Sequence, residues 1–97
     1  MKLTTMISTT EKGETLKIEG RIVRLYVGAY QHKFLIHKSA TGFPYLSHFA
    51  SGGRIGPLKI ASHENCRKLA IGLIDRLISI KGVDAVNDVL NKAPVLN

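Results

Sequence analysis

The residues best suited to metal binding or nucleophilic chemistry in this 97-residue sequence are its four histidines and its single cysteine. His63 and Cys66 stand three positions apart, which places both side chains on one face of a predicted helix. His37 and His48 fall on neighbouring predicted strands. Structural zinc sites usually combine two closely spaced ligand pairs, whereas this chain offers one mixed pair. We therefore expect no metal and no cofactor, with Cys66 as a small core residue.

The sequence also lacks the patterns that catalysis requires. The seven Asp and Glu residues are scattered, and no G-x-S-x-G, H-E-x-x-H or G-x-x-x-x-G-K-[ST] motif occurs. One weak nucleophile geometry is present, because Cys66 near a helix start with His63 beside it would have a lowered thiol pKa. We predict a non-enzymatic protein and assign no catalytic residue.

A glycine-rich segment, residues 51–57, has the composition of a phosphate-binding loop, with three glycines and one proline. Glycine allows backbone N–H groups to approach an anion, and Arg54 is placed to clamp it. Nucleotide-binding fingerprints run directly into a helix, but here Pro57 intervenes before Ser62, the predicted N-cap. We interpret 51–57 as a flexible loop that ends the sheet and offers Arg54 to a nucleic-acid backbone. A connection without a binding role is the alternative.

The positive charge of the chain is confined to its middle. The formal net charge is +7, from 14 Lys and Arg against 7 Asp and Glu. Residues 1–16 and 69–97 each sum to zero, so residues 17–68, with nine cations and only Glu19 and Glu64, carry all of it. A concentrated positive field attracts nucleic acid or an acidic protein surface. A solubilising face is the other interpretation.

Aromatic residues are interleaved with these cations, which is typical of nucleic-acid-binding surfaces. Phosphates bind ammonium and guanidinium groups, and exposed rings stack on bases. Most of the six aromatics are expected in the core, but a tyrosine tolerates water at its hydroxyl end. The predicted binding residues for nucleic acid or an acidic partner are Lys17, Arg21, Arg24, Tyr26, Tyr30, Lys33, Lys38, Arg54, Lys59, Arg67 and Lys68.

These residues must be positioned by strands in the first half of the chain. Alternation predicts strands over 2–9, about 15–30, 33–38 and 43–49. In the second of these the inward-facing parity changes near Gly20, which indicates a bulge, a bend or a change of layer. Pro44 cannot donate a ladder hydrogen bond, so it lies at the first position of its strand or on an edge.

Helical periodicity follows. Ser62 is the predicted N-cap and Glu64 lies in the first turn. The expected apolar stripe contains Cys66, Leu69, Ala70, Leu73, Leu77 and Ile80. Gly72 inside this helix indicates a close crossing with another element. Lys81 and Gly82 form a predicted cap, after which a short helix marked by Val83, Val86 and Leu90 ends at Pro94.

The order of elements predicts an α+β fold. We expect a single domain over residues 1–97, with an antiparallel sheet of about four strands and one long and one short C-terminal helix packed on one face. The other face is expected to be free for water or a partner. In architecture, a sheet followed by a helix is similar to plant AP2 and integrase arm-binding domains, whose sheet enters the major groove. The connection between Phe49 and Ser62 is longer here, and no side-chain motif is shared.

The sequence thus favours a non-enzymatic nucleic-acid-binding module that uses a basic sheet surface and a Gly-rich loop within residues 17–68. The alternative is a small accessory or inhibitor protein, of the type that phages and mobile elements encode, which docks on an acidic surface of a host protein complex. Self-association through strand 43–49 or the second helix, as a homodimer, is a third interpretation. With one cysteine, no secretory signal and no long apolar run, the expected location is cytoplasmic and no membrane partner is expected.

Overall fold

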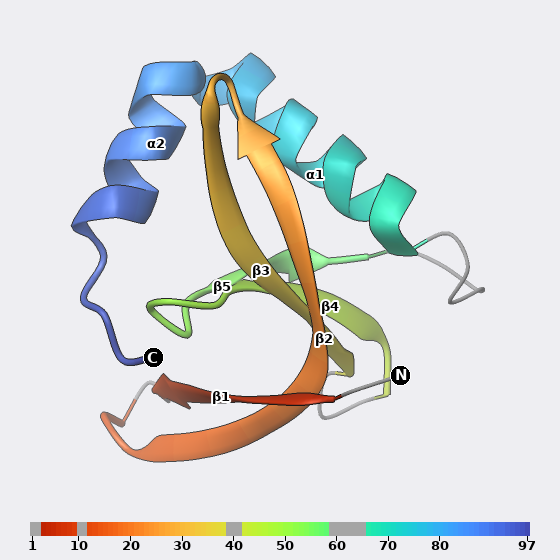
Figure 1. The fold of residues 1–97 in the computed structure, drawn as a ribbon, viewed down its shortest axis with the longest axis vertical. Coiled ribbons are helices and arrows are strands. Elements are labelled where there is room, and N and C mark those ends of the chain that lie inside the picture. Colours follow the sequence, from red (N-terminus) through yellow and green to blue (C-terminus); the bar gives the residue numbers. More distant parts are fainter. Residues whose placement is uncertain (1–2, 10–11, 39–41, 59–65) are drawn as a thin grey trace.

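The computed structural model of the chain describes residues 3–9, 12–38, 42–58 and 66–97. The strands are β1 (Thr4–Thr9), β2 (Thr15–Val27), β3 (Tyr30–Lys38), β4 (Pro44–His48) and β5 (Arg54–Pro57), and the helices are α1 (Cys66–Lys81) and α2 (Val83–Lys92). The strands form one antiparallel sheet in the order β1-β2-β3-β4-β5, so each pairs with its neighbours in sequence (Figure 1). This confirms the predicted α+β class, with five strands in place of about four.

The additional strand, β5, lies inside the segment that was predicted to be a loop. It pairs with β4 through Ser47 opposite Arg54 and Leu46 opposite Gly56, with a bulge between the two pairs. Ile55, between the two paired β5 residues, is partly buried against the core. The loop prediction is therefore wrong from Arg54 onward, because here glycine accompanies a tight turn and a bulge rather than the end of the sheet.

A two-residue turn at Gly28 and Ala29 joins β2 to β3. Gly28 has φ +64°, the left-handed conformation that short hairpin turns require. The alternation of apolar residues predicted one strand through to about residue 30 and the next from residue 33. The structure instead ends β2 at Val27 and begins β3 at Tyr30, so the two strands form one long hairpin.

β2 bends at Gly20, where its pairing passes from β1 to β3. Gly20 is opposite Thr4 on one side and His37 on the other. A β-carbon at this position would overlap the carbonyl oxygen of Ile36, so the close approach requires glycine. Even-numbered residues of β2 face inward before the bend and odd-numbered residues after it. This confirms the predicted change of parity.

Both helices pack on one face of the sheet, over β2 and β3 (Figure 1). α1 buries Cys66, Ala70 and Ile74, which are spaced by one turn. The main core combines these with strand residues and with α2: Val23, Leu25, Val27, Phe34, Ile36, Leu46, Leu58, Val86 and Leu90. Ile80 does not belong to this face; it is 71% exposed, contrary to the predicted stripe.

The close crossing predicted for Gly72 occurs at another glycine. Nothing lies within 4 Å of where a β-carbon on Gly72 would stand. On β5, a β-carbon on Gly56 would stand 3.2 Å from a methyl group of Leu73. The bare backbone that lets α1 approach the sheet is therefore on the strand and not on the helix.

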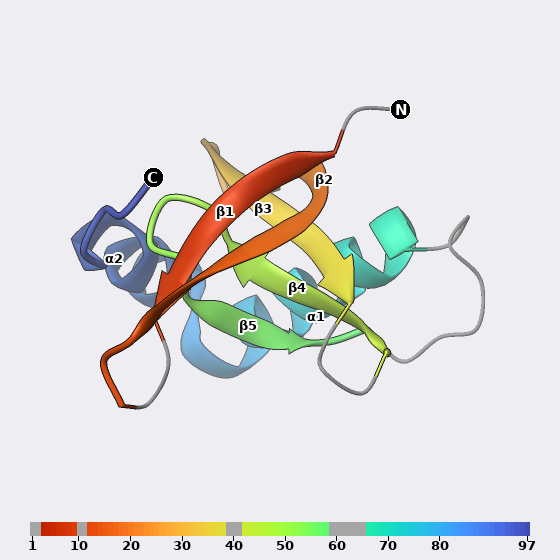
Figure 2. The same ribbon diagram turned by 90° about the horizontal axis from the view of Figure 1, so that it is seen from below.

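We expected the opposite face of the sheet to be free, but part of it is covered by the sheet itself. β1 and the first half of β2 curl over β4 and β5 (Figure 2). Met6 on β1 and Leu35 on β3 are both 0% exposed on this face. Ser8 Oγ donates a hydrogen bond to the Gly52 carbonyl at 2.7 Å, which joins β1 to the β4–β5 turn. Beyond the bend, Arg24, Tyr26 and Lys33 of the β2–β3 hairpin are exposed on this face.

Several smaller expectations are settled by the same structure. Pro44 is the first residue of β4, one of the two positions foreseen for it. β4 has a partner on each side, so it is not a free strand for self-association.

Gly82 separates the helices with φ +88°, and its N–H donates to the Ile78 carbonyl, as a helix cap does. Ser62 and Glu64 lie outside the described residues. In the described chain, neither helix combines the length and apolarity needed to cross a bilayer.

Candidate nucleic-acid interface

Two cations face each other on the open part of the sheet. Arg24 on β2 is directly opposite Lys33 on β3, and both side chains are exposed. Their neighbours Val23, Leu25 and Phe34 point to the helices and are buried, so Arg24 and Lys33 point away from the helices. Like charges in directly opposite positions destabilise an antiparallel pair. The pair therefore has a cost in the isolated protein that a bound anion would remove.

Aromatic rings flank this pair. Tyr26, two residues after Arg24, lies on the same face and is 64% exposed, with Gln31 opposite it. The Lys33 ammonium lies 5.9 Å from the centroid of the Phe49 ring, a cation–π contact that extends the surface toward β4. We call Arg24, Tyr26, Gln31 and Lys33 the hairpin face. Tyr30 is equally exposed but lies opposite Val27, on the other side of the hairpin.

The sequence around the hairpin face contains no counter-charge. No Asp or Glu occurs between Gly20 and His63, a stretch that holds six cations. The described carboxylates lie outside the part of the hairpin where β2 and β3 pair: Glu14 precedes β2, Glu19 is in its first half, and Asp75, Asp84 and Asp88 are on the helices. The paired stretch from Gly20 to His37 therefore carries only positive formal charge, and Asp75 of α1 lines a hollow together with Arg24. This uninterrupted run of cations is a more specific indication of an anion-binding surface than the total charge of the chain.

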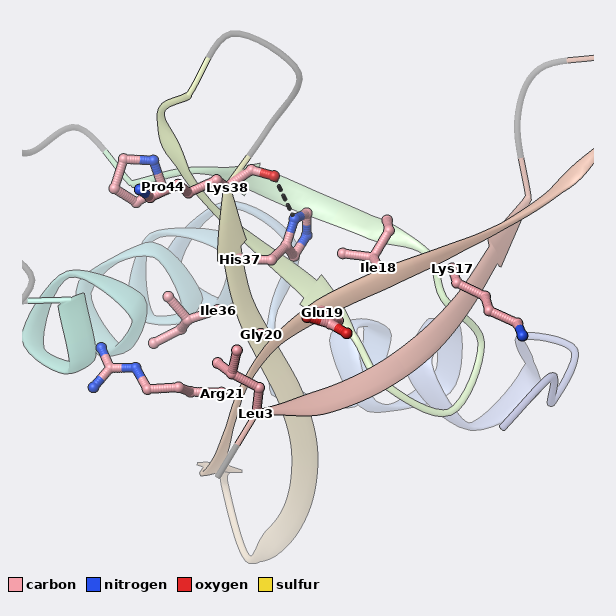
Figure 3. A pocket seen from close by; sticks show the side chains of 10 residues that line it. All are labelled: Leu3, Lys17, Ile18, Glu19, Gly20, Arg21, Ile36, His37, Lys38 and Pro44. Carbon is pink, nitrogen blue, oxygen red and sulfur yellow. Dashed lines mark hydrogen bonds between the residues drawn. The ribbon is translucent and has the colours of Figure 1, made fainter. Parts of the chain in front are cut away.

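Three other predicted cations line a separate groove of about 480 Å³ at the bend of β2. Lys17, Arg21 and Lys38 surround it together with Glu19 and apolar side chains. Figure 3 shows Lys17 and Arg21 pointing to opposite sides of the groove. These cations therefore widen the positive region without converging on one point.

His37 stands inside this groove as a neutral hydrogen-bonding group. The Lys38 carbonyl, which can only accept, is 3.3 Å from its Nδ1, so that nitrogen carries the proton (Figure 3). Its Nε2 is then an acceptor for the Ser47 hydroxyl at 2.8 Å. Burial lowers the pKa of His37; the Lys38 carbonyl raises it, and nearby Arg54 lowers it further. His37 thus adds no positive charge to the groove near neutral pH.

The remaining predicted residues are distributed over other elements. Arg54 is exposed on β5, and the turn before it is fixed by hydrogen bonds from Gly52 N–H to the His48 carbonyl and from His48 N–H to the Gly53 carbonyl. Arg54 is therefore on a paired strand and not in the loop predicted for it. Arg67 and Lys68 begin α1 and diverge: Arg67 lies beside Arg24 and Tyr26, whereas Lys68 lines a hollow near Pro57. Lys59 lies outside the described residues.

Gln31 is a member of the hairpin face that the sequence analysis missed. It was overlooked because the third strand was predicted to begin at Lys33. The signal that would have found it is Gly28, a residue suited to a two-residue turn. A turn there places Gln31 opposite Tyr26 and Lys33 opposite Arg24 by simple counting.

In the described part of the chain, the candidate metal ligands do not come together as a cluster. Cys66 is buried at 0% exposure and is in no disulfide, and His63 lies outside the described part of the chain. His32 and His48 are neighbours, with ring centroids 6.1 Å apart beneath α2. Within residues 3–9, 12–38, 42–58 and 66–97, however, no three His, Cys, Asp or Glu side chains gather as a metal ion requires.

Comparison with known proteins identified no relative of this chain. No family model matches the chain, and neither the curated proteins nor the solved structures provide a match.

Proposed function

We propose that this protein is a non-enzymatic nucleic-acid-binding module that uses the hairpin face. The observation that carries the proposal is the Arg24–Lys33 pair, two exposed cations in directly opposite positions on a hairpin without a carboxylate. Placing a phosphate between them converts a mutual repulsion into two attractive contacts. Long-range attraction by the rest of the basic region would raise the rate of encounter.

The aromatic side chains suggest how a strand would lie on this face. Tyr26 presents a ring on the same side as the two cations, and Phe49 lies beside Lys33. Bases stack on such rings without regard to sequence, while the cations hold the backbone. We therefore expect binding with little sequence specificity, with single strands favoured over duplex because their bases are accessible.

A salt titration with matched variants tests this proposal. Fluorescence anisotropy would be measured with labelled single- and double-stranded DNA and RNA at 50 and 200 mM salt. Each phosphate contact contributes about 0.7–0.9 to the slope of log K against log salt, so loss of the two contacts in Arg24→Ala/Lys33→Ala should reduce the slope by about 1.4–1.8. The control, Arg76→Ala/Lys81→Ala, removes the same charges from exposed positions on α1 and should leave most of the slope unchanged.

The outcomes separate the two interpretations of the basic region. If both double variants lose affinity equally, only net charge matters and the hairpin face is not a site. If no oligonucleotide binds at 50 mM salt, the region serves an acidic protein surface instead. In that case the accessory or inhibitor function becomes the better proposal, and it predicts a stoichiometric protein complex that survives nuclease treatment.

A single substitution tests the stacking role. Tyr26→Ala should weaken single-strand binding by about 1–3 kcal/mol, the range for one base stacked on an aromatic ring, and should affect duplex binding less. The control is Tyr30→Ala, which removes an equally exposed ring from the other side of the hairpin. Equal losses for the two variants would contradict the placement of bases on the hairpin face.

A further inference from the structure

The second half of β2 has an unpaired edge. β1 leaves β2 at Gly20, and from Ile22 to Val27 the strand pairing that the described residues make is with β3 alone. Alternate residues of such a strand direct their N–H and C=O groups outward. These outward-facing backbone groups can pair with another strand. Domains that bind peptides by strand addition use a strand edge of this type.

A groove runs between this edge and α1. It has a volume of about 220 Å³ and is lined by Arg24, Leu25 and Tyr26 from β2 and by Arg67, Ile71, Ile74 and Asp75 from α1. In Figure 1 the first arm of the hairpin, β2, is the one beside α1, and the helix runs in the same general direction as the strand. A strand added to β2 would therefore have α1 on one of its faces.

The side of α1 that faces the groove changes along the helix from a basic residue through an apolar residue to an acidic one. Arg67, Ile71 and Asp75 are spaced by four residues, so they form one line along the helix. Ile71 is 40% exposed, a large apolar side chain left open beside the strand edge. The line spans about 12 Å at 1.5 Å per residue, which is the length of roughly four residues of extended chain. Arg67 and Arg24 supply two cations to the groove, against one carboxylate at Asp75.

We propose that this groove binds an extended, acidic segment of a partner protein, which adds to the sheet as a strand along β2. Backbone pairing supplies affinity, Ile71 contacts an apolar side chain of the segment, and a carboxylate of the segment pairs with Arg67 or Arg24. A nucleic acid has no peptide groups to continue the ladder. Addition of a second copy of this chain would bring the Arg24 and Arg67 side chains of both copies together, so the charge favours an acidic segment over self-pairing.

This inference stands apart from the proposed function, because the two surfaces depend on different residues. The peptide groove needs Ile71 and Arg67, whereas the hairpin face needs Lys33. Arg24 and Tyr26 lie at the border of both. Variants at Ile71 and Lys33 therefore separate failure of one proposal from failure of the other.

The experiment uses two synthetic probes and the full chain labelled with nitrogen-15. One probe is a blocked eight-residue peptide that alternates glutamate with valine, and the other has lysine in place of glutamate. The glutamate peptide should shift the amide signals of residues 21–27 and 67–75 and slow hydrogen exchange at outward-facing amides of β2. Ile71→Asn should weaken its binding by about tenfold, as expected for loss of one buried apolar side chain. Ile80→Asn, at a 71% exposed site on the same helix, is the matched control and should change nothing.

A charge reversal provides the second test. Arg67→Glu should bind the lysine peptide more tightly than the glutamate peptide, reversing the preference of the unaltered chain. Arg67 is exposed at the start of α1, so this variant is expected to fold even if Ile71→Asn does not. The proposal is overturned if neither peptide binds, if both bind the unaltered chain equally, or if the shifts are confined to Lys33 and Phe49. Retained oligonucleotide binding in Ile71→Asn, with retained peptide binding in Lys33→Ala, would confirm two separate surfaces.

Discussion

The side-chain amide of Asn97 forms hydrogen bonds with both the N–H and the carbonyl group of Ile7. The Asn97 Oδ1 atom accepts from the Ile7 N–H at 2.7 Å, and Nδ2 donates to the Ile7 carbonyl at 3.0 Å. Nδ2 also donates to the Phe49 carbonyl at 2.7 Å. One amide side chain thus takes the place of a neighbouring strand on the outer edge of β1, and it ties that edge to the residue after β4.

Replacing Asn97 with alanine should loosen β1. At about 0.5–1.5 kcal/mol for each hydrogen bond, and at the low end because the site is exposed, Asn97→Ala should lower the free energy of unfolding by about 1–2 kcal/mol. Urea denaturation measures this loss, and hydrogen exchange should show faster exchange at the Ile7 amide. Asn91→Ala, an exposed amide on α2, is the control. Equal effects of the two variants would show that the Asn97 contacts contribute nothing.

Two glycine substitutions should have opposite signs. Gly52 has φ +70°, and a β-carbon there would overlap the Ile7 carbonyl oxygen. Gly52→Ala should therefore destabilise the fold by more than about 2 kcal/mol. Gly72 lies in α1 with open space around it, so Gly72→Ala should stabilise the fold by about 0.5–1 kcal/mol. Thermal denaturation of both variants measures these changes in stability. A loss of stability in Gly72→Ala would contradict the open space around Gly72 and favour the close helix crossing that the sequence suggested.

Acid should destabilise the protein through two histidines. Burial lowers the pKa of His48, with a further lowering from nearby His32, and burial likewise lowers the pKa of His37, in both cases from an ordinary value of 6.5. Below about pH 6.5 the unfolded chain binds protons that the folded chain does not. This part of the stability is present above pH 6.5 and is lost as the pH falls toward the lowered native pKa values.

The measurement is urea denaturation at pH 7.5 and pH 5.0. The unaltered chain should be less stable at pH 5.0, and His37→Gln/His48→Gln should show a smaller difference between the two pH values. Glutamine keeps a polar group at each position without the titration. An unchanged pH dependence in the double variant would assign the effect to other groups.

Asn87 should determine how firmly α2 is held on the hairpin. It is buried, its Nδ2 donates to the Val27 carbonyl at 3.0 Å, and its Oδ1 accepts from His32 Nε2 at 2.7 Å. Asn87→Ala leaves both partners unsatisfied and should cost about 1–3 kcal/mol. A double-mutant cycle with His32→Ala should give a coupling energy of at least about 0.5 kcal/mol. Strict additivity would contradict the contact.

The sequence was informative where periodicity is strong. The change of parity at Gly20 and the cap at Gly82 follow from local rules of strand and helix geometry, and both are present. The class of fold followed from the order of elements. Local rules failed where a segment is stabilised by distant partners: β5 is a strand because Ile55 reaches the core, although the glycine-rich segment 51–57 that contains it resembles a loop.

The site was predictable only as a region. Charge counting identified residues 17–68, but it could not divide them between the hairpin face and the groove at the bend, because that division depends on which strands pair and where β1 turns away. Register alone brings Arg24 and Lys33 together. The burial of Met6 and Leu35 on the second face could not be predicted either, because it results from the curl of the whole sheet and not from any one segment.

The strict order of the sheet also has a consequence for how the chain folds. Every strand pairs with a neighbour in sequence, so the sheet can extend one hairpin at a time, with short loops to close at each step. The contacts that close the curl are different: Ser8 reaches Gly52 across 44 positions and Asn97 reaches Ile7 across 90. We expect these closures to form after the rate-limiting step. Substitutions at Ser8 and Asn97 should then accelerate unfolding and leave the refolding rate unchanged, which stopped-flow kinetics would measure.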